Sequence, residues 1–287
     1  MDFLYSYIIL AEVYVLLGLS TNLLVGIAGI FSVSQAAVFG VGAYLVAHFL
    51  MAESLGFIPA LAIAAVACIV LNILVTLPAL RVSGDYFVVT SFGIQLLATA
   101  VFTNWTNATG GANGLPGIPP PDVFGLPIES TGQFVILCSV AMAIGGLAFW
   151  LLMRAPFGRL LRAIREDELA VAAAGKNVLR AKVSAAALAG AFAGSAGGFY
   201  ATFLSFVDPS SFDLDASILL LTMVVVGGAR TLAGSVLGPF LLLALPQVLT
   251  LVDIPTSIAA AMRQLIYGVL LILFMLFRPQ GLAGEKL

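Results

Sequence analysis

MRAPFGRLLRAIREDELAVAAAGKNVLRAK, residues Met153–Lys182, is the only long charged stretch in a chain that is otherwise a succession of apolar runs. It holds seven of the twelve basic residues together with the acidic run Glu166, Asp167 and Glu168. Because basic residues in loops favour the cytoplasmic side of a membrane, this stretch orients the whole protein. It is also where we expect a soluble partner to make contact.

The composition of the chain lies far outside that of soluble globular proteins. Of its 287 residues, 61% are apolar and 9% are charged, whereas charged residues make up about a quarter of an ordinary soluble domain. The apolar runs are long enough for helices that cross roughly 30 Å of hydrocarbon, and they are continuous where the strands of a membrane barrel would alternate. We therefore expect an all-α integral membrane protein, a polytopic bundle of about eight to ten transmembrane helices that forms one domain over residues 1–287.

Nine apolar runs are separated by charges and turn residues. They span residues 3–27, 30–50, 57–79, 86–104, 132–152, 183–205, 216–229, 231–252 and 257–277. The seventh has about 14 residues, too few for a straight crossing, and is expected to be tilted, broken or re-entrant. No basic residue precedes the first run, unlike the start of a cleaved signal peptide, so we interpret it as a retained span.

Loops with basic residues alternate with loops that have none. The basic ones contain Arg81, the Arg154–Lys182 block, Arg230, and Arg278 with Lys286. The loops between them, at 51–57, 104–131, 206–215 and 253–255, carry acidic residues but no Lys or Arg. The positive-inside rule then places the loop 153–182 and the C-terminus in the cytoplasm, and the N-terminus and the loop 105–131 outside. Arg263 lies within the last run, where we expect it to snorkel outward or to line a polar cavity.

The residues that carry chemistry are few and scattered. The chain has one histidine, two well separated cysteines and carboxylates that lie mainly in loops, which do not form an acid–base pair or a metal cluster at a recognised spacing. The segment 227–231, GGART, lacks the GxxxxGK[ST] arrangement of a phosphate-binding loop. We therefore expect no catalytic residue, no metal and no cofactor bound by this chain, so any ATP that drives it is bound by another chain.

Ionisable residues inside the apolar runs are also scarce. Glu12 is the main acidic candidate, accompanied by the neutral Asn22, Asn72 and Gln95. Carriers driven by an ion gradient keep such groups near the bilayer midplane. Glu12 therefore leaves a self-contained ion-driven carrier open as an alternative function.

Small residues recur on one face of the sixth run. Gly190, Gly194 and Gly198 follow one another at intervals of four residues, and Gly234 and Gly238 repeat the spacing in the eighth run. This spacing lets a neighbouring helix approach closely. Ordinary packing within the membrane accounts for it, and a subunit or gating interface is the alternative.

The charged stretch itself predicts short helices. Its apolar side consists of Leu160, Leu161, Ile164 and Leu169. Arg162 and Glu166 stand four residues apart on the other side, where we expect them to pair. Residues 170–174 continue a helix that Gly175 ends in left-handed geometry. Two functions fit this pattern: a solvated anchor on the cytoplasmic side, or a docking helix for a groove on a cytoplasmic motor subunit.

Several pieces of the sequence, in their order along the chain, resemble a known family. They are GIFSVSQAAVFGVGAY (29–44), LRVSGDYFVVTSFG (80–93), TGGANGLPGIP (109–119), FGRLLRAIREDELAVAAAGKNV (157–178) and FVDPSSFDLDASILLLTMVVVGGARTLAGSVLGP (206–239). Together they cover most of the chain, which resembles the LivM-type permease subunit of branched-chain amino-acid ABC importers.

The resemblance implies a pore-forming subunit of a bacterial or archaeal cytoplasmic (inner) membrane. Its partners would be a LivH-like permease in a heterodimer, two cytoplasmic ATP-binding subunits that use the ATP, an extracytoplasmic solute-binding protein and the lipid bilayer, with no nucleic acid. The segment before Lys182 looks like the part that contacts the ATPases, whose closure would switch the bundle between outward and inward access. The ATPase-coupling residues expected here are Arg159, Arg162, Arg165, Glu166, Glu168, Ala173 and Gly175.

Three departures from the family's pattern concern the substrate. Ile30 and Gln35 replace a glutamine and a histidine that are common there, and Arg230 stands where a small residue is usual. Leucine-type amino acids, urea, short amides and other carboxylates are therefore all open as substrates. An ion-driven secondary carrier is the second hypothesis for function, and a membrane scaffold without transport is the third.

Overall fold

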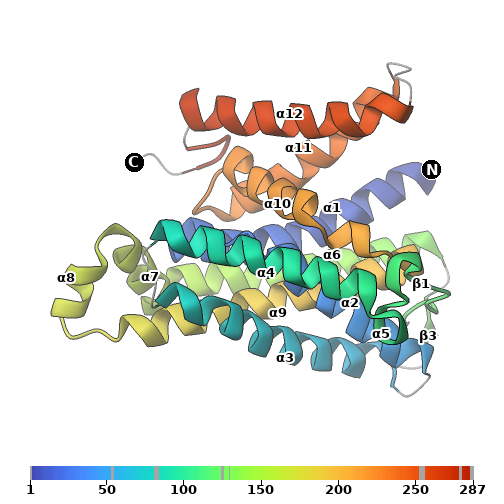
Figure 1. Ribbon diagram of the computed structural model, residues 1–287, viewed down its shortest axis with the longest axis horizontal. Coiled ribbons are helices and arrows are strands. Elements are labelled where there is room, and N and C mark those ends of the chain that lie inside the picture. Colours follow the sequence, from blue (N-terminus) through green and yellow to red (C-terminus); the bar gives the residue numbers. More distant parts are fainter. Residues whose placement is uncertain are drawn as a thin grey trace.

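The computed structural model of the chain describes residues 2–52, 55–80, 84–123, 126–128, 130–251, 256–277 and 280–284. Most of this part of the chain is helical (Figure 1). The helices that coincide with the nine apolar runs are α1 (Asp2–Thr21), α2 (Gln35–Met51), α3 (Phe57–Thr76), α4 (Gly84–Asn104), α6 (Thr131–Arg154), α9 (Val178–Leu204), α10 (Leu214–Gly227), α11 (Leu232–Leu251) and α12 (Thr256–Phe277). The predicted all-α polytopic membrane protein is confirmed.

Shorter elements join these helices. The helical ones are η1 (Asn22–Ile27), η2 (Leu77–Leu80), α5 (Thr106–Thr109), η3 (Gly111–Asn113), α7 (Pro156–Glu166), α8 (Glu168–Ala173) and η4 (Pro209–Phe212). The two-residue strands are β1 (Leu115–Pro116), β2 (Asp122–Val123), β3 (Leu126–Pro127) and β4 (Phe206–Val207). In the described residues, five apolar segments are long enough to cross a membrane: α1 extended by η1, α3, α4, α6 and α9. Four further apolar segments, in α2, α10, α11 and α12, are shorter, and α10 has the 14 residues expected of the seventh run.

The second crossing differs from the prediction. A continuous helix over 30–50 was expected, but α2 begins only at Gln35, after a non-helical segment. Gly29, with a φ of +70°, turns the chain out of the π-helical turn η1. The Val33 N–H then donates to the Ser91 hydroxyl of α4 at 3.1 Å, so a side chain replaces a helical carbonyl as its acceptor.

The central helix of the larger group is α9. It packs along α2 and α3, with α1 and α6 completing the group (Figure 1). A Cβ added to Gly194 of α9 would lie 2.7 Å from the Cβ of Cys68 in α3, and one added to Gly42 of α2 would lie 2.6 Å from the Gly194 carbonyl oxygen. These helices approach so closely because glycine has no side chain.

A smaller group, α10, α11 and α12, packs on α1 along one side of the bundle (orange to red in Figure 1). The segment 280–284 returns to it: the Leu282 N–H donates to the Val226 carbonyl at 2.9 Å, and the Ala283 N–H donates to the Gly227 carbonyl at 3.0 Å. The chain after α12 is thereby tied to the C-terminal turn of α10.

The charged loop 153–182 and the loop 105–131 lie at opposite ends of the bundle (Figure 1). α7 and α8 occupy one end, and α5, β1 and β3 the other, where the chain also begins. Besides the single turn of α5, the loop 105–131 forms β1, which pairs antiparallel with β4 of the next loop at this end, and the antiparallel pair of β2 with β3. Which end faces the cytoplasm stays a prediction from the charges. The predicted loop residues Glu53, Arg81, Glu129, Asp253–Pro255, Arg278 and Lys286 lie outside the described residues, as does the side chain of Arg263.

Candidate functional site

α7 is an amphipathic helix laid against the end of the bundle. Pro156 occupies its first turn, where the missing N–H costs nothing. Leu161 and Ile164 are 0% and 3% exposed. Gly158 lies so close to the end of α6 that an added Cβ would be 2.5 Å from the Leu152 carbonyl oxygen. The predicted apolar side is confirmed for Leu161 and Ile164, and it fixes α7 on the bundle.

α8, in contrast, projects away from the bundle. None of its residues is buried, and Leu169 is 82% exposed. The expectation that Leu169 belongs to the apolar side is wrong, because the extended backbone of Asp167, with a φ of −152°, turns the chain between the two helices. The Asp167 side chain caps α8 by accepting from the Ala170 N–H at 2.9 Å.

The end of α8 follows the prediction. Gly175 has a φ of +76°, its N–H donates to the Ala172 carbonyl at 2.9 Å, and the Lys176 N–H donates to the Val171 carbonyl at 3.3 Å. This pair of bonds is the Schellman motif, which glycine permits at the residue after the cap. α8 is therefore a short, exposed helix with a defined start and a defined stop.

Two of the acidic residues of the charged stretch form ion pairs. Glu166 Oε1 accepts from Arg230 Nη2 at 2.8 Å, and Glu168 Oε2 accepts from Lys182 Nζ at 2.7 Å. The expected pair of Arg162 with Glu166 is not formed, since Arg162 instead donates to the Met153 carbonyl at 2.7 Å. Arg162 therefore bonds to a carbonyl at the end of α6, and Glu166 bonds to a cation from the α10–α11 connection.

Arg165 turns inward from α7. Its Nη1 donates to the Gly26 carbonyl of η1, and its side chain covers Gly29, whose added Cβ would lie 2.9 Å from Arg165 Cγ. Partial desolvation lowers the pKa of Arg165, the neighbouring charge of Arg230 lowers it further, and Glu166 raises it. An arginine stays protonated through such a shift, so a positive charge sits between α7 and η1.

Asn22 closes a ring of contacts at this end. Its Oδ1 accepts from the Arg230 N–H at 2.8 Å, and its Nδ2 donates to the Thr231 carbonyl at 2.9 Å and to Ser235 Oγ at 2.7 Å. Arg230 has a φ of +74°, unusual for a residue with a side chain. We call the set Asn22, Gly26, Arg165, Glu166 and Arg230 the contact ring. It joins η1, α7 and the α10–α11 connection. A displacement of α7 would therefore also displace η1, which leads into the non-helical start of the second crossing.

The structure thus separates the predicted coupling residues into two sets. Arg165 and Glu166 enter the contact ring although both are exposed, whereas the other five, Arg159, Arg162, Glu168, Ala173 and Gly175, lie outside it. Sequence reasoning missed that Asn22 and Arg230 face each other. The available signal was an asparagine at the end of a long apolar run, which needs a polar partner inside the membrane.

Glu12 and Asn72, inside the spans, are buried, and each forms at least one hydrogen bond to another helix. Glu12 is 4% exposed and its Oε1 accepts from Ser139 of α6 at 2.5 Å. Asn72 accepts from Gln35 at 3.2 Å and donates to the Ala186 carbonyl at 2.8 Å, which ties α2, α3 and α9 together. These groups hold helices to one another, and Glu12 belongs to the α1–α6 contact.

Comparison with known proteins agrees with this architecture. The sequence model of the family described as branched-chain amino acid transport system / permease component matches residues 3–275. The chain belongs to this permease family. Among relatives, the high-affinity branched-chain amino acid transport system permease protein LivM of Escherichia coli K12 is 31% identical over 95% of this chain and 68% of its own length. The LivM protein of Salmonella typhimurium LT2 is 30% identical over 94% of this chain and 67% of its own length.

A more distant permease of this kind comes from an archaeon. The probable branched-chain amino acid transport permease protein LivM of Methanocaldococcus jannaschii is 26% identical over 79% of this chain and 68% of its own length. No solved structure gives a significant match to the chain. The resemblance drawn from the sequence pieces is therefore confirmed at the level of the family.

Proposed function

We propose that the chain is the pore-forming permease subunit of an ATP-binding-cassette importer that moves branched-chain amino acids into the cytoplasm. The relatives' names, which describe branched-chain amino acid transport permeases, support this substrate class. Its partners are a LivH-like permease, two cytoplasmic ATP-binding subunits and an extracytoplasmic solute-binding protein. The C-terminus and the α7–α8 loop face the cytoplasm.

The observation that carries the proposal is the contrast between α7 and α8. α8 has no buried residue and all of its residues except the half-buried Val171 are exposed, whereas α7, directly before it, is buried on one side and tied through the contact ring to η1. A protein that docks on α8 would therefore pull on α7 and, through it, on the broken second crossing. An anchor that only holds the loop at the membrane surface needs no such connection.

Reconstitution tests this function. Proteoliposomes that contain this chain, the second permease and the ATP-binding subunits should take up radiolabelled L-leucine delivered by the binding protein when MgATP is enclosed on the cytoplasmic face. Omission of the ATP-binding subunits, or a Walker A lysine substitution in them, should abolish uptake. Uptake of L-leucine by this chain alone, driven by a proton or sodium gradient without nucleotide, would instead establish the ion-driven carrier.

A further inference from the structure

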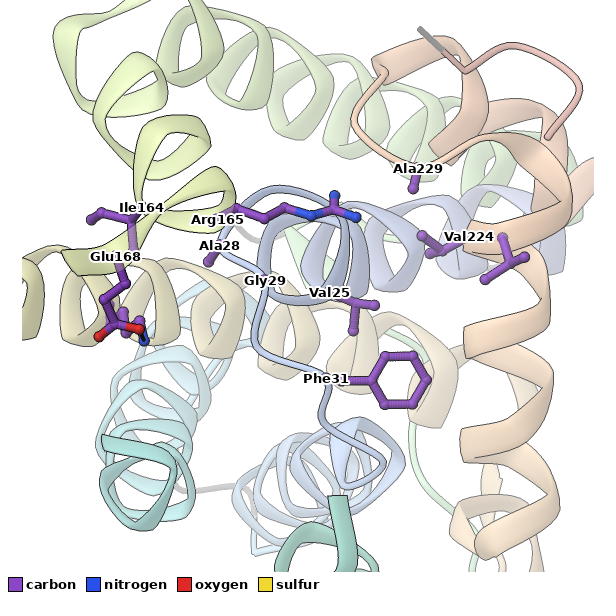
Figure 2. Close-up of a pocket in the computed structure, with 11 residues that line it drawn as sticks. Val25, Ala28, Gly29, Phe31, Ile164, Arg165, Glu168, Val224 and Ala229 are labelled. Atoms are coloured by element: carbon purple, nitrogen blue, oxygen red, sulfur yellow. Dashed lines mark hydrogen bonds and ion pairs between the residues drawn. The ribbon is translucent and has the colours of Figure 1, made fainter. Parts of the chain in front are cut away.

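A cavity of about 540 Å³ opens at the coupling end of the molecule. Figure 2 shows it between the chain that leaves η1, the α7–α8 loop and the C-terminal part of α10. Val25, Ala28, Gly29 and Phe31 line one side, and Val224, Val225 and Ala229 line another.

One wall of the cavity is the non-helical part of the second crossing, residues 28–34. Irregular backbone at membrane depth is tolerated where protein buries it or where it lines a water-filled cavity. Protein groups satisfy part of it, since the Ile30 N–H donates to the Leu24 carbonyl at 2.9 Å. Gly29 and Phe31, however, are exposed and face the cavity. Discontinuous helices of this kind form solute sites in membrane transporters.

The lining combines apolar walls with one available cation. Lys182 also lines the cavity, but its Nζ forms an ion pair with Glu168 Oε2 at 2.7 Å. Among the described residues, no carboxylate lies within ion-pair distance of the Arg165 guanidinium. Figure 2 shows this side chain extending from α7 across the cavity toward Ala229 and Val224. One of its five N–H donors is used by the Gly26 carbonyl, so others are available to a carboxylate.

We infer that this cavity is the inner vestibule of the solute pathway and binds a small amino acid with an apolar side chain, whose carboxylate faces Arg165. The inference rests on the proposed function and names a site for it. The side chain of the solute lies against Val25, Phe31 and Val225. Because Arg165 sits on α7 within the contact ring, a movement of α7 displaces the group that holds the carboxylate, and the docking loop thereby controls release.

Thiol protection tests the vestibule. The full complex, with Cys68 and Cys138 replaced by alanine and Val225→Cys in this chain, is placed in inside-out vesicles without nucleotide and treated with a negatively charged methanethiosulfonate reagent. L-Leucine should slow modification, whereas leucinol, which has the same side chain and amino group but no carboxylate, should not. Leu179→Cys is the control, since Leu179 lies in the charged stretch, does not line the cavity and is 53% exposed; L-leucine should not alter its reaction.

The role of Arg165 is tested in the Val225→Cys background. Arg165→Gln should weaken protection by L-leucine about 10- to 100-fold in concentration, as expected for the loss of a hydrogen bond to a charged group. Arg180→Gln removes a charge from the same loop at an exposed position outside the cavity and should leave protection unchanged. ATP-dependent uptake of L-leucine by proteoliposomes that contain the same complex, with the binding protein outside and MgATP enclosed, reads the proposed function separately.

The outcomes distinguish the two claims. Uptake without protection at Val225→Cys overturns the vestibule and leaves the proposed function standing. Equal protection by L-leucine and leucinol overturns the assignment of the carboxylate to Arg165. Unchanged protection in Arg165→Gln overturns the assignment of the carboxylate contact. Absence of ATP-dependent uptake by the complete complex defeats the proposed function itself.

Discussion

Gly175 gives a sharp test of the docking loop. Its φ of +76° is left-handed, and no atom lies within 4 Å of a Cβ added there. Alanine at this position therefore meets no steric overlap and introduces only backbone strain. That strain is about 1 to 2 kcal/mol for a residue with a Cβ, which lowers the ratio of the observed turn to other conformations about 5- to 30-fold.

Gly175→Ala should weaken binding of the ATP-binding subunits by up to this factor, because the α8 surface is then presented in fewer molecules. The assay is a titration of the purified ATP-binding subunit onto the two permeases in nanodiscs. Gly175→Asn should lie between alanine and wild type, since asparagine tolerates left-handed geometry. The yield of inserted protein should stay unchanged in all variants.

Gly117 provides the matched control. It has a φ of +82° and likewise no atom within 4 Å of an added Cβ, but it lies in the loop at the opposite end of the bundle. Gly117→Ala introduces the same backbone strain and should leave ATPase binding at the wild-type level. Equal affinity of Gly175→Ala and wild type, or an equal loss in both alanine variants, would refute the reasoning.

Three further predictions concern packing, the contact ring and a helix cap. Gly194→Ala should destabilise the protein by about 1 to 3 kcal/mol, since its Cβ would lie 2.7 Å from Cys68 Cβ. Gly93→Ala, with no atom within 4 Å of the added Cβ, should be neutral or stabilising. Thermal unfolding followed by size-exclusion chromatography measures both variants, and equal melting temperatures would count against the close approach. Arg230→Gln should lower ATP-dependent uptake, and adding Glu166→Gln should lower uptake little further, because the two side chains form one ion pair. Additive losses of uptake in a double-mutant cycle would show that Arg230 and Glu166 act separately. Burial raises the pKa of Asp213, so the folded state holds the proton more tightly and stability falls as pH rises through the raised pKa. Asp213→Asn should remove this dependence and keep the cap on the Ala216 N–H, whereas Asp213→Ala should cost about 1 kcal/mol of stability. An unchanged pH profile of stability in Asp213→Asn would contradict the assignment.

The number and order of the apolar helices could be predicted from the sequence because each apolar run is long enough for several helical turns. The break at residues 28–34 could not. It lies in a run that is apolar enough to be a helix, and only Gly29 and the serines after it mark the change. The bond from Val33 to Ser91 joins residues far apart in the chain, so no local pattern reveals it.

The candidate site was predictable in part for the same reason. The amphipathic pattern predicted the buried side of α7, and Gly175 predicted the end of α8, since both depend on neighbouring residues. The ion pairs depend on the tertiary fold: Arg230 reaches Glu166 across 64 positions, and a local rule favoured Arg162 instead. Leu169 was assigned to the apolar side because the extended turn at Asp167 is invisible to helical periodicity.

A photo-crosslinking amino acid at Leu169 tests the central claim most directly, namely that ATP-driven work enters this chain through the exposed helix α8. Leu169 is 82% exposed on that helix, and Trp105, 59% exposed at the opposite end of the bundle, is the control position. In the assembled importer, the probe at residue 169 should form a covalent adduct with the ATP-binding subunit, and the probe at residue 105 should form none. An adduct of the ATP-binding subunit with residue 105 and none with residue 169 would contradict the account.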